Sequence, residues 1–340
     1  MNRHFRIFVN FNLLTVYISL SYTYSMLNIS IRQMHTLLAI QRHGKISAAA
    51  KSLGLTSPAV TLQLQQLEQE LGCQLFLRSK SGAQPTEIGE IAIQTARRIV
   101  NEVTSLGETV QAHKGVAAGT IRLGVVSTGK YFAPRVIAAF TALHPGISMT
   151  LVAANRSEII QKLHDHDIDI ALMGRPPTSF GVNATLFGDH PLVFIASPDH
   201  PLVGKLDISR EELAEQKFIV RERGSGTRSS FEFFMADTIE GMRTVPTEMD
   251  SNETIKQAVI AGLGIAFISG HTIEQECQAG RIAILDVVET PIRRQWFAIR
   301  HANRSATPAL QALDDFLRVR GPSLLPVMSK PYQAMLPVQT

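Results

Sequence analysis

The sequence is poor in the residues that mark several common classes of protein. Its 340 residues include only two cysteines, Cys73 and Cys277, too few for a disulfide framework and too far apart for a structural zinc site. The early apolar run from Ile7 to Leu20 is interrupted by two asparagines and is too short to cross a bilayer. No GxSxG, HExxH or GxxxxGKS/T motif is present. We therefore expect no catalytic residue, no metal site and no membrane partner, in a reducing, cytoplasmic compartment.

The first 28 residues differ from the rest of the chain. Arg3 and Arg6 precede the apolar run and no acidic residue occurs, a pattern that superficially resembles an export signal. No A-x-A cleavage site follows the run. We interpret residues 1–28 as a non-structural extension that comes from an upstream start, with an export signal as the alternative.

Charge and length outline the organisation of the remaining chain. The formal net charge is +4, and within residues 30–86 the basic residues outnumber the two acidic residues, Glu68 and Glu70. Residues 115–340 are nearly balanced in charge. A polyanion would therefore meet the N-terminal part. A hydrophobic content of 45% over this length fits about two globular domains with connectors.

Three short helices are predicted in residues 29–86. Apolar spacing is helical from Ile31 to a break at His43-Gly44. A second helix fits 47–53 with Ser47 as its N-cap, and a third begins with Ser57 as N-cap and Pro58 as its first residue. Gly72 ends the third helix. This order is typical of a helix-turn-helix, although a small helical bundle without DNA remains the alternative.

The outward face of the third helix decides between these two interpretations. A solvated helix face usually carries Glu and Lys, whereas this face carries amides, a hydroxyl and a leucine. Such groups suit base edges and thymine methyls in a major groove. The predicted base-contacting residues of this helix are Ser57, Pro58, Ala59, Thr61, Leu62, Gln65 and Gln66.

The run SAAAKSLGLTSPAVTLQLQQLE (47–68), followed by Leu71-Gly72 and Leu75-Phe-Leu-Arg78, resembles the DNA-binding end of LysR-type transcriptional regulators. The resemblance implies a winged helix-turn-helix over residues 29–86 and double-stranded operator DNA as a partner. It places Ser47 at the DNA and Arg78 in the wing, where a guanidinium suits phosphate. Many members carry glutamine before the proline, whereas this chain has Ser57.

Residues 87–115 are predicted to form one long linker helix. Ala92, Ala96, Ile99, Val103, Leu106 and Val110 follow alternating spacings of four and three, which make a narrow heptad seam. The seam favours pairing with a second copy through residues 92–110, as a dimer or tetramer, and the resembled family dimerises through this helix. Packing of the helix on its own domain is the alternative.

Residues 116–320 alternate strand and helix patterns, which predicts mostly parallel α/β packing in two lobes. This arrangement resembles the periplasmic-binding-protein-like effector domain of the same family. The predicted fold class is therefore α/β with an all-α N-terminal head. The last segment, 321–340, contains four prolines and is interpreted as a flexible tail.

Ligands of open α/β sheets bind beyond the carboxyl ends of strands, beside helix N-termini. Several cations fall there, so we expect a small anionic ligand. The predicted ligand-binding residues are Ser127, Thr128, Lys130, Asn155, Arg156, Arg175, Gly226, Thr227, Arg228 and Asn252.

Segments 126–134, 170–177, 221–228 and 251–264 resemble the subgroup that regulates the RuBisCO and Calvin-cycle operon of autotrophic bacteria. The resemblance implies an activator of carbon dioxide fixation genes that acts as a homotetramer, without a cofactor but with a phosphorylated metabolite or NADPH as effector. The alternatives are a solute-binding protein of the same two-lobe fold and a LysR-type regulator of another operon.

Overall fold

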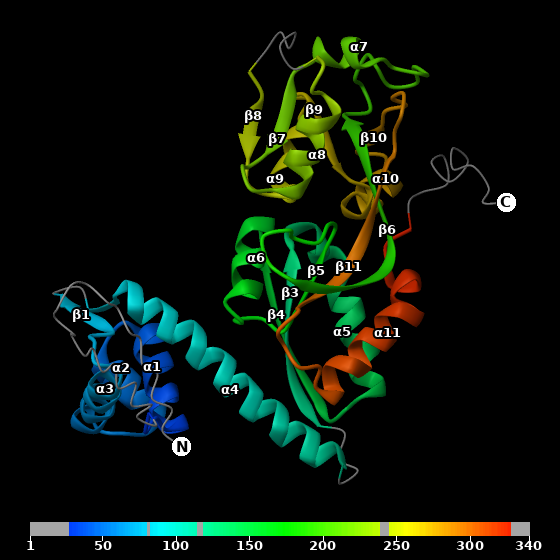
Figure 1. The fold of residues 1–340 in the computed structure, drawn as a ribbon. Helices are drawn as coiled ribbons and strands as arrows, with labels where there is room; N and C mark the ends of the chain where they lie inside the picture. Colours follow the sequence, from blue (N-terminus) through cyan, green and yellow to red (C-terminus); the bar gives the residue numbers. More distant parts are fainter. Residues whose placement is uncertain (1–26, 80–81, 114–117, 239–244, 328–340) are drawn as a thin grey trace, which may run out of the picture. The chain divides into compact units, whose positions relative to one another are not determined.

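The computed structural model describes residues 27–79, 82–113, 118–238 and 245–327 (Figure 1). The chain divides into two compact units, residues 1–100 and residues 101–340, and each is described by itself. Most of the predicted extension and of the predicted tail lies outside the described residues. At Asn28 the chain is already part of the fold, because its backbone N–H donates to the Glu70 carboxylate at 3.1 Å.

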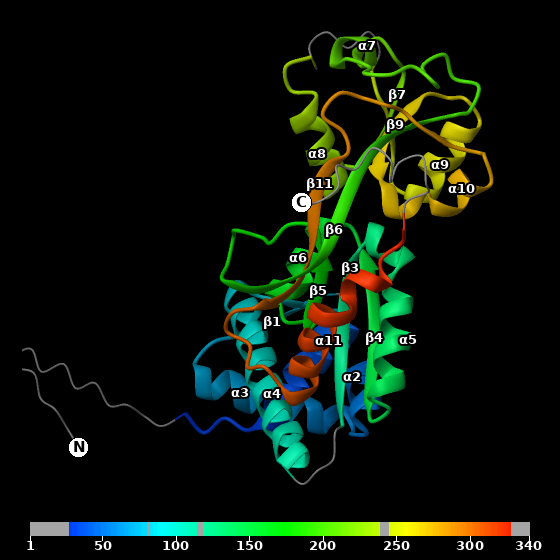
Figure 2. The ribbon, with the colours of Figure 1, turned by 90° about the vertical axis from the view of Figure 1, so that its right-hand side faces the viewer.

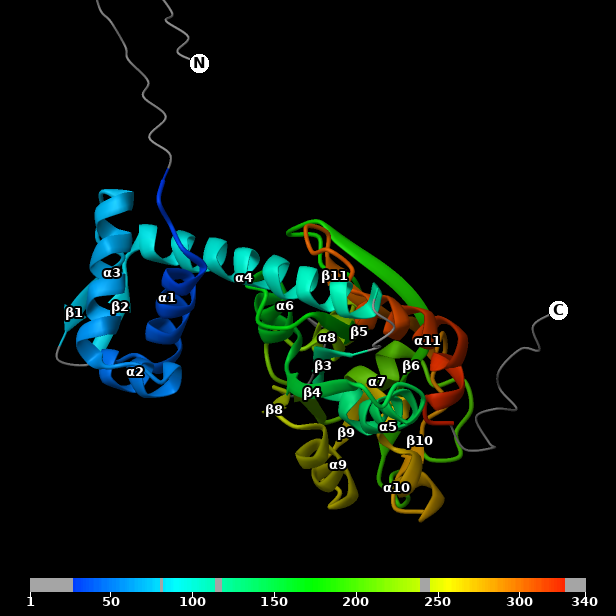
Figure 3. The same ribbon diagram turned by 90° about the horizontal axis from the view of Figure 1, so that it is seen from below.

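The N-terminal unit is a three-helix head with a two-stranded wing. Its helices are α1 (Ile31–His43), α2 (Ile46–Leu53) and α3 (Ser57–Leu71), followed by β1 (Phe76–Ser79) and β2 (Gly82–Pro85). Figure 3 shows α2 lying across the ends of α1 and α3. Their shared core contains Leu37, Ile40, Val60, Leu67 and Leu75. The order and spacing of the three helices are as predicted.

Two predicted helix caps are wrong by one or two residues. The N-cap of α2 is Lys45, whose backbone is extended, so Ser47 lies within the first turn and is exposed. The N-cap of α3 is Thr56, whose hydroxyl accepts from the N–H of Ala59 at 3.4 Å. Ser57 is therefore the first helical residue, and its side chain is left exposed on the surface.

Helix α4 (Glu87–His113) extends from the first unit into the second, as one continuous helix. Ile93 and Ala96 are buried in the head core. The later seam residues are exposed: Val103 by 46%, Leu106 by 65% and Val110 by 44%. Ile93 and Ala96 therefore pack in the head, whereas the later seam residues stay partly exposed among the described residues.

The second unit is a continuous nine-stranded sheet that forms two lobes (Figures 1 and 2). Its strand order is β4-β3-β5-β11-β6-β9-β7-β8, with β10 on β6. The strands are β3 (Gly119–Val126), β4 (Ile147–Ala154), β5 (Ile170–Met173), β6 (Val182–Ala196), β7 (Phe218–Arg221), β8 (Thr247–Met249), β9 (Ile265–Ser269), β10 (Ala283–Ile284) and β11 (Ile292–His301).

Helices cover both faces of each lobe. In lobe 1, built on β3, β4 and β5, the helices α5 (Ala133–Leu143) and α11 (Pro308–Leu324) share one core and α6 (Arg156–His164) the other. In lobe 2, built on β7, β8 and β9, α8 (Gly226–Phe234) and α9 (Asn252–Ile260) lie in separate cores. Shorter elements are α7 (Arg210–Ala214), α10 (Glu274–Gln278), η1 (Ser127–Tyr131) and η3 (Gly270–Thr272).

Strands β6 and β11, called here the crossing strands, run from one lobe into the other (Figure 2). They pair antiparallel with each other and with the adjoining strands, so the prediction of mostly parallel packing holds only inside each lobe. The sequence pattern predicts a strand only over 192–196, the last third of β6, because Gly188 and Pro191 interrupt the pattern before it.

The predicted start of the flexible tail, residue 321, lies too early in the chain, because the last helix continues past it. Helix α11 continues through Gly321 and Pro322 to Leu324, and Gly321 and Leu325 are buried. A Cβ at Gly321 would lie 2.9 Å from the Phe187 ring, so the helix approaches the crossing strand closely at this point. Within the described residues, no helix is long and apolar enough to span a membrane.

Candidate functional site

The exposed face of α3 carries the predicted base-contacting groups. Ser57, Pro58, Gln65 and Gln66 are exposed, and Leu62 is 55% exposed although it is apolar. Ala59 and Thr61 are half-buried. The Thr61 hydroxyl donates to the carbonyl of Ser57 at 2.9 Å, so its lone pairs remain open to a donor. The face therefore offers amides, one hydroxyl acceptor and an apolar tip, and no charged group from this set of residues.

The wing is held against α3 by one carboxylate. Glu68 accepts from the backbone N–H groups of Leu75 and Phe76, at 2.8 and 3.4 Å. Strand β1 then pairs with β2, with Arg78 opposite Ala83. The side chain of Arg78 lies outside what the structure describes, so its predicted phosphate contact stays a prediction.

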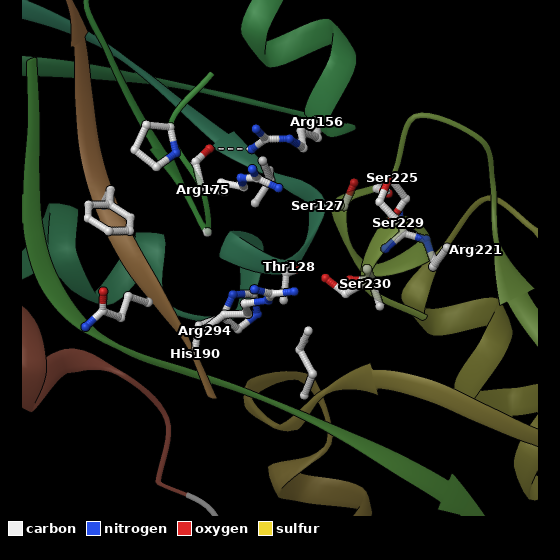
Figure 4. A pocket seen from close by; sticks show the side chains of 18 of the residues that line it. Ser127, Thr128, Arg156, Arg175, His190, Arg221, Ser225, Ser229, Ser230 and Arg294 are labelled. Atoms are coloured by element: carbon white, nitrogen blue, oxygen red, sulfur yellow. Dashed lines mark hydrogen bonds between the residues drawn. The ribbon is translucent and has the colours of Figure 1, made fainter. Parts of the chain in front are cut away.

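A cavity of about 1070 Å³ lies between the two lobes (Figure 4). Strand ends and helix N-termini of both lobes line it, together with the crossing strands. The polar lining residues are Ser127, Thr128, Asn155, Arg156, Arg175, Thr178, Asp189, His190, Arg221, Ser225, Thr227, Ser229, Ser230, Arg293, Arg294 and Gln295.

The structure brings most of the predicted ligand-binding residues to this cavity. Those that line it are Ser127, Thr128, Asn155, Arg156, Arg175, Gly226 and Thr227.

Three predicted residues do not line the cavity. Lys130 is exposed on η1. Arg228 faces away, with its guanidinium bonded to Glu232 at 2.6 Å and to the carbonyl of Arg221 at 3.0 Å. Asn252 is buried behind the lining, where its Oδ1 accepts from Arg221 at 2.5 Å. It positions a lining arginine.

Local chain geometry explains the lobe 1 side of the cavity. Asn155 caps α6, with Oδ1 accepting from the N–H of Glu158 at 3.0 Å, and Arg156 opens the helix. The Arg156 guanidinium donates to the carbonyl of Arg175 at 2.6 Å, which brings the two side chains together (Figure 4). Burial and the neighbouring Arg175 charge lower the pKa of Arg156. An anion placed here would relieve that repulsion.

On the lobe 2 side, the cavity is lined by Arg221, which is not in the predicted ligand-binding set and whose charge is neutralised within the chain. Arg221 ends β7 and forms a two-point pair with Glu222, at 2.7 and 2.8 Å. Arg221 is only 2% exposed, so it contributes shape and fixed donors more than free charge. Its neighbours Ser225, Ser229 and Ser230 come from the start of α8 and add hydroxyls (Figure 4). The run of serines at the start of this helix is the signal in the sequence that could have identified these hydroxyls.

The crossing strands supply several lining residues outside the predicted set, among them His190 and Arg294. His190 on β6 lies opposite Arg294 on β11 in the antiparallel register. The sequence pattern predicts the second of these strands only over 295–299, which leaves Arg293 and Arg294 outside it. Only the pairing of two segments a hundred residues apart brings them together, and no local pattern encodes that pairing.

The histidines behind the cavity are neutral. His190 stacks on Trp296 with ring centroids 4.1 Å apart, and burial and the charges of His271 and Arg294 hold its pKa well below 6.5. His271 accepts a hydrogen bond from the Trp296 indole at 3.1 Å, and burial lowers its pKa to about 4. The positive charge of the cavity therefore comes from its arginines.

This arrangement suits binding of an anion. Among the described residues, no group of three or more His, Cys, Asp or Glu is placed to hold a metal ion. The cavity offers guanidinium groups and hydroxyls around a volume that fits a small metabolite.

Comparisons with known proteins agree with this organisation. Residues 31–90 match the family model "Bacterial regulatory helix-turn-helix protein, lysR family", and residues 114–321 match "LysR substrate binding domain". The chain is 56% identical over 309 residues to the HTH-type transcriptional regulator CbbR of Rhizobium meliloti, covering 91% of this chain and 99% of that one. It is 40% identical over 291 residues to the RuBisCO operon transcriptional regulator of Allochromatium vinosum, covering 86% and 96%.

A solved structure also resembles the second unit. The regulatory domain of CcmR from Synechocystis PCC6803, in complex with 2-PG, is 36% identical with a TM-score of 0.56, covering 59% of this chain and 96% of that one. The predicted fold class is confirmed, with a DNA-binding head that a solute-binding protein lacks. The chain belongs to the LysR family of transcriptional regulators.

Proposed function

We propose that this regulator binds operator DNA of RuBisCO genes and that a small phosphorylated metabolite in the cavity controls its action there. It acts in the cytoplasm, as a homotetramer assembled through the exposed seam of α4. The observation that carries the target is the identity of 56% to a CbbR over nearly the whole of both chains. The RuBisCO operon regulator at 40% identity supports the same target.

The effector class rests on the charges of the cavity. Among the described residues, one carboxylate lines it, Asp189, against five arginines: Arg156, Arg175, Arg221, Arg293 and Arg294. A neutral effector would leave this excess charge uncompensated in a partly desolvated site, whereas a phosphate ester would offset it. The related CcmR domain was solved with 2-PG, which is 2-phosphoglycolate, a compound of this class.

Operator binding by the head rests on the face of α3. Thr61, Leu62 and Gln65 contact base edges, while Arg78 and Ser47 contact the phosphate backbone of the DNA. In a symmetric oligomer, two such heads reach successive major grooves of a two-fold operator.

The proposal is tested in two arms. A footprint on DNA upstream of the RuBisCO genes of the same genome should show protection, with none on shuffled DNA of equal composition. Calorimetry should show binding of 2-phosphoglycolate to the full chain, weakening as salt rises. NADPH in a parallel titration tests the other candidate effector. Protection of a different metabolic promoter in place of the RuBisCO promoter would contradict the target, and no binding of any anionic metabolite would contradict the effector class.

A further inference from the structure

Arg294 is a half-buried cation of the cavity without a partner in the chain. Within the described residues its guanidinium makes no hydrogen bond and no ion pair. Of the other lining arginines, Arg175 and Arg293 are exposed. The two that are more buried are engaged: Arg221 with Glu222 and Asn252, and Arg156 with the carbonyl of Arg175. A partly desolvated guanidinium is stable when an anion accepts its hydrogen bonds. Arg294 therefore points to an anionic group that the ligand itself supplies.

The surroundings of Arg294 keep its charge uncompensated by protein. Its cross-strand neighbour His190 is 7% exposed, stacked on Trp296, and neutral because its pKa is lowered. The nearest acidic residue along the crossing strands, Asp189, is one position from His190 and pairs in register with Gln295. Asp189 also lines the cavity, and its side chain is exposed. It forms no ion pair with Arg294.

Arg294 is also set apart from the paired arginines of lobe 1. Figure 4 shows Arg156 and Arg175 together at one side of the cavity, near Ser127, and Arg294 at another, with His190 and Thr128. The first group presents two guanidinium groups at the start of α6, an arrangement that suits the dianionic charge of a phosphate. The second group presents one planar guanidinium, that of Arg294, whose paired N–H donors suit a carboxylate.

We propose that the cavity selects a ligand with two separated anionic groups. Its phosphate binds at Arg156 and Arg175, and its carboxylate binds at Arg294, which is therefore the residue that recognises the second anion. This inference rests on the proposed effector function and specifies its ligand. A ligand with only a phosphate leaves Arg294 unpaired and gains nothing from it. Because Arg294 lies on a crossing strand, pairing of the carboxylate also acts on the segment that joins the lobes.

The test compares two compounds that differ in one group. 2-Phosphoglycolate carries a phosphate and a carboxylate, whereas ethylene glycol phosphate replaces the carboxylate by a hydroxymethyl group. Both are titrated calorimetrically into the full chain, into Arg294→Gln, which removes the charge, and into Arg294→Lys, which keeps the charge without the fork. Arg318→Gln is the control, since that arginine is 66% exposed and pairs with Asp315 on the surface of α11.

In the parent chain we expect 2-phosphoglycolate to bind more tightly than ethylene glycol phosphate. Arg294→Gln should weaken binding of 2-phosphoglycolate by about 10- to 100-fold and leave the affinity for ethylene glycol phosphate within about twofold of the parent value. The affinity of Arg294→Lys for 2-phosphoglycolate should lie between those of the parent and Arg294→Gln. Arg318→Gln should bind both compounds like the parent.

Three results would overturn the inference. Parent-like binding of 2-phosphoglycolate by Arg294→Gln would remove Arg294 from the site, and equal weakening of both compounds would remove its selectivity for the carboxylate. If the parent binds both compounds equally, the protein does not recognise the second anion. If the parent binds neither, the proposed effector class itself fails, so the two failures are distinct.

Discussion

Asp169 holds Arg122 by three hydrogen bonds, two from the guanidinium at 2.6 and 3.0 Å and one from the backbone N–H at 2.6 Å. The same carboxylate pairs with Arg304 at 2.8 Å and is only 3% exposed. The Arg122 guanidinium also donates to Asn101 on α4, at 3.3 Å. One buried carboxylate thus ties β3, the chain after β11 and the second half of α4 into one unit.

Removing that charge should destabilise the second unit. Asp169→Asn leaves two guanidinium groups facing a neutral amide, and breaking a buried ion pair costs about 3–5 kcal/mol. Denaturant unfolding of the full chain should show this loss. Asp315→Asn is the matched control, because Asp315 forms a surface pair with Arg318 whose loss costs less than about 1 kcal/mol. Equal losses of unfolding free energy in the two variants would show that the buried cluster contributes no more to stability than the surface pair does.

Base readout should be separable from phosphate contact in the head. Gln65→Ala should cost about 1–3 kcal/mol on the operator and little on random DNA, because it removes only a base-edge contact. Arg78→Ala should weaken both and lower the salt slope of binding by about one unit. Anisotropy titrations at several salt concentrations measure both quantities. If Gln65→Ala loses affinity equally on the two DNAs, Gln65 reads no base.

The exposed seam of α4 should control assembly. Val103→Asp with Leu106→Asp places two carboxylates in the interface between helices, which is costly unless the chains separate. Sedimentation should show a smaller oligomer, together with loss of operator binding. The control, Arg98→Asp, adds an acid at an exposed position outside the seam. An unchanged oligomer in the double variant would mean that the seam is not the interface.

Stability should fall as the pH is lowered, because of the buried histidines. The folded pKa of His271, about 4, lies below its ordinary value of 6.5, so the unfolded chain binds a proton that the folded chain excludes. The free energy of unfolding therefore decreases below about pH 6.5, by about 2 kcal/mol at pH 5 from this residue. His190, whose pKa is also lowered, acts in the same direction.

Unfolding of the parent and of His271→Gln at a series of pH values measures this contribution. The parent should lose more stability between pH 7 and pH 5 than the variant, which has no imidazole at position 271 to titrate. Parallel pH curves for the two proteins would show that His271 is charged, or unburied, in the folded state.

Local patterns predicted the elements that local forces determine. The helical spacing of the head, the glycine ends of α1 and α3, and the long α4 all follow from short-range periodicity and capping. The helix N-termini that carry Ser127, Asn155 and Thr227 follow from strand–helix alternation for the same reason.

The missed residues depend on tertiary pairing. His190 and Arg294 become neighbours only through the register of two antiparallel strands, and Gly188 and Pro191 hide one of those strands from any propensity argument. The exclusion of Arg228 and Asn252 from the cavity likewise depends on their bonds to Glu232 and Arg221, which spacing does not reveal.

Control of the head by an anionic metabolite in the cavity can be measured by titrating 2-phosphoglycolate into protein bound to RuBisCO promoter DNA. Footprints are compared for the parent, Thr128→Val and Arg156→Gln. Thr128→Val deletes a buried hydroxyl at nearly constant volume, which costs a bonded ligand about 1–3 kcal/mol. All three proteins should protect the DNA equally without ligand. The parent footprint should then change with 2-phosphoglycolate, and each variant should need at least about 10-fold more. A footprint that changes at the same concentration in all three proteins, or in none, would show that a ligand in the cavity does not control DNA binding.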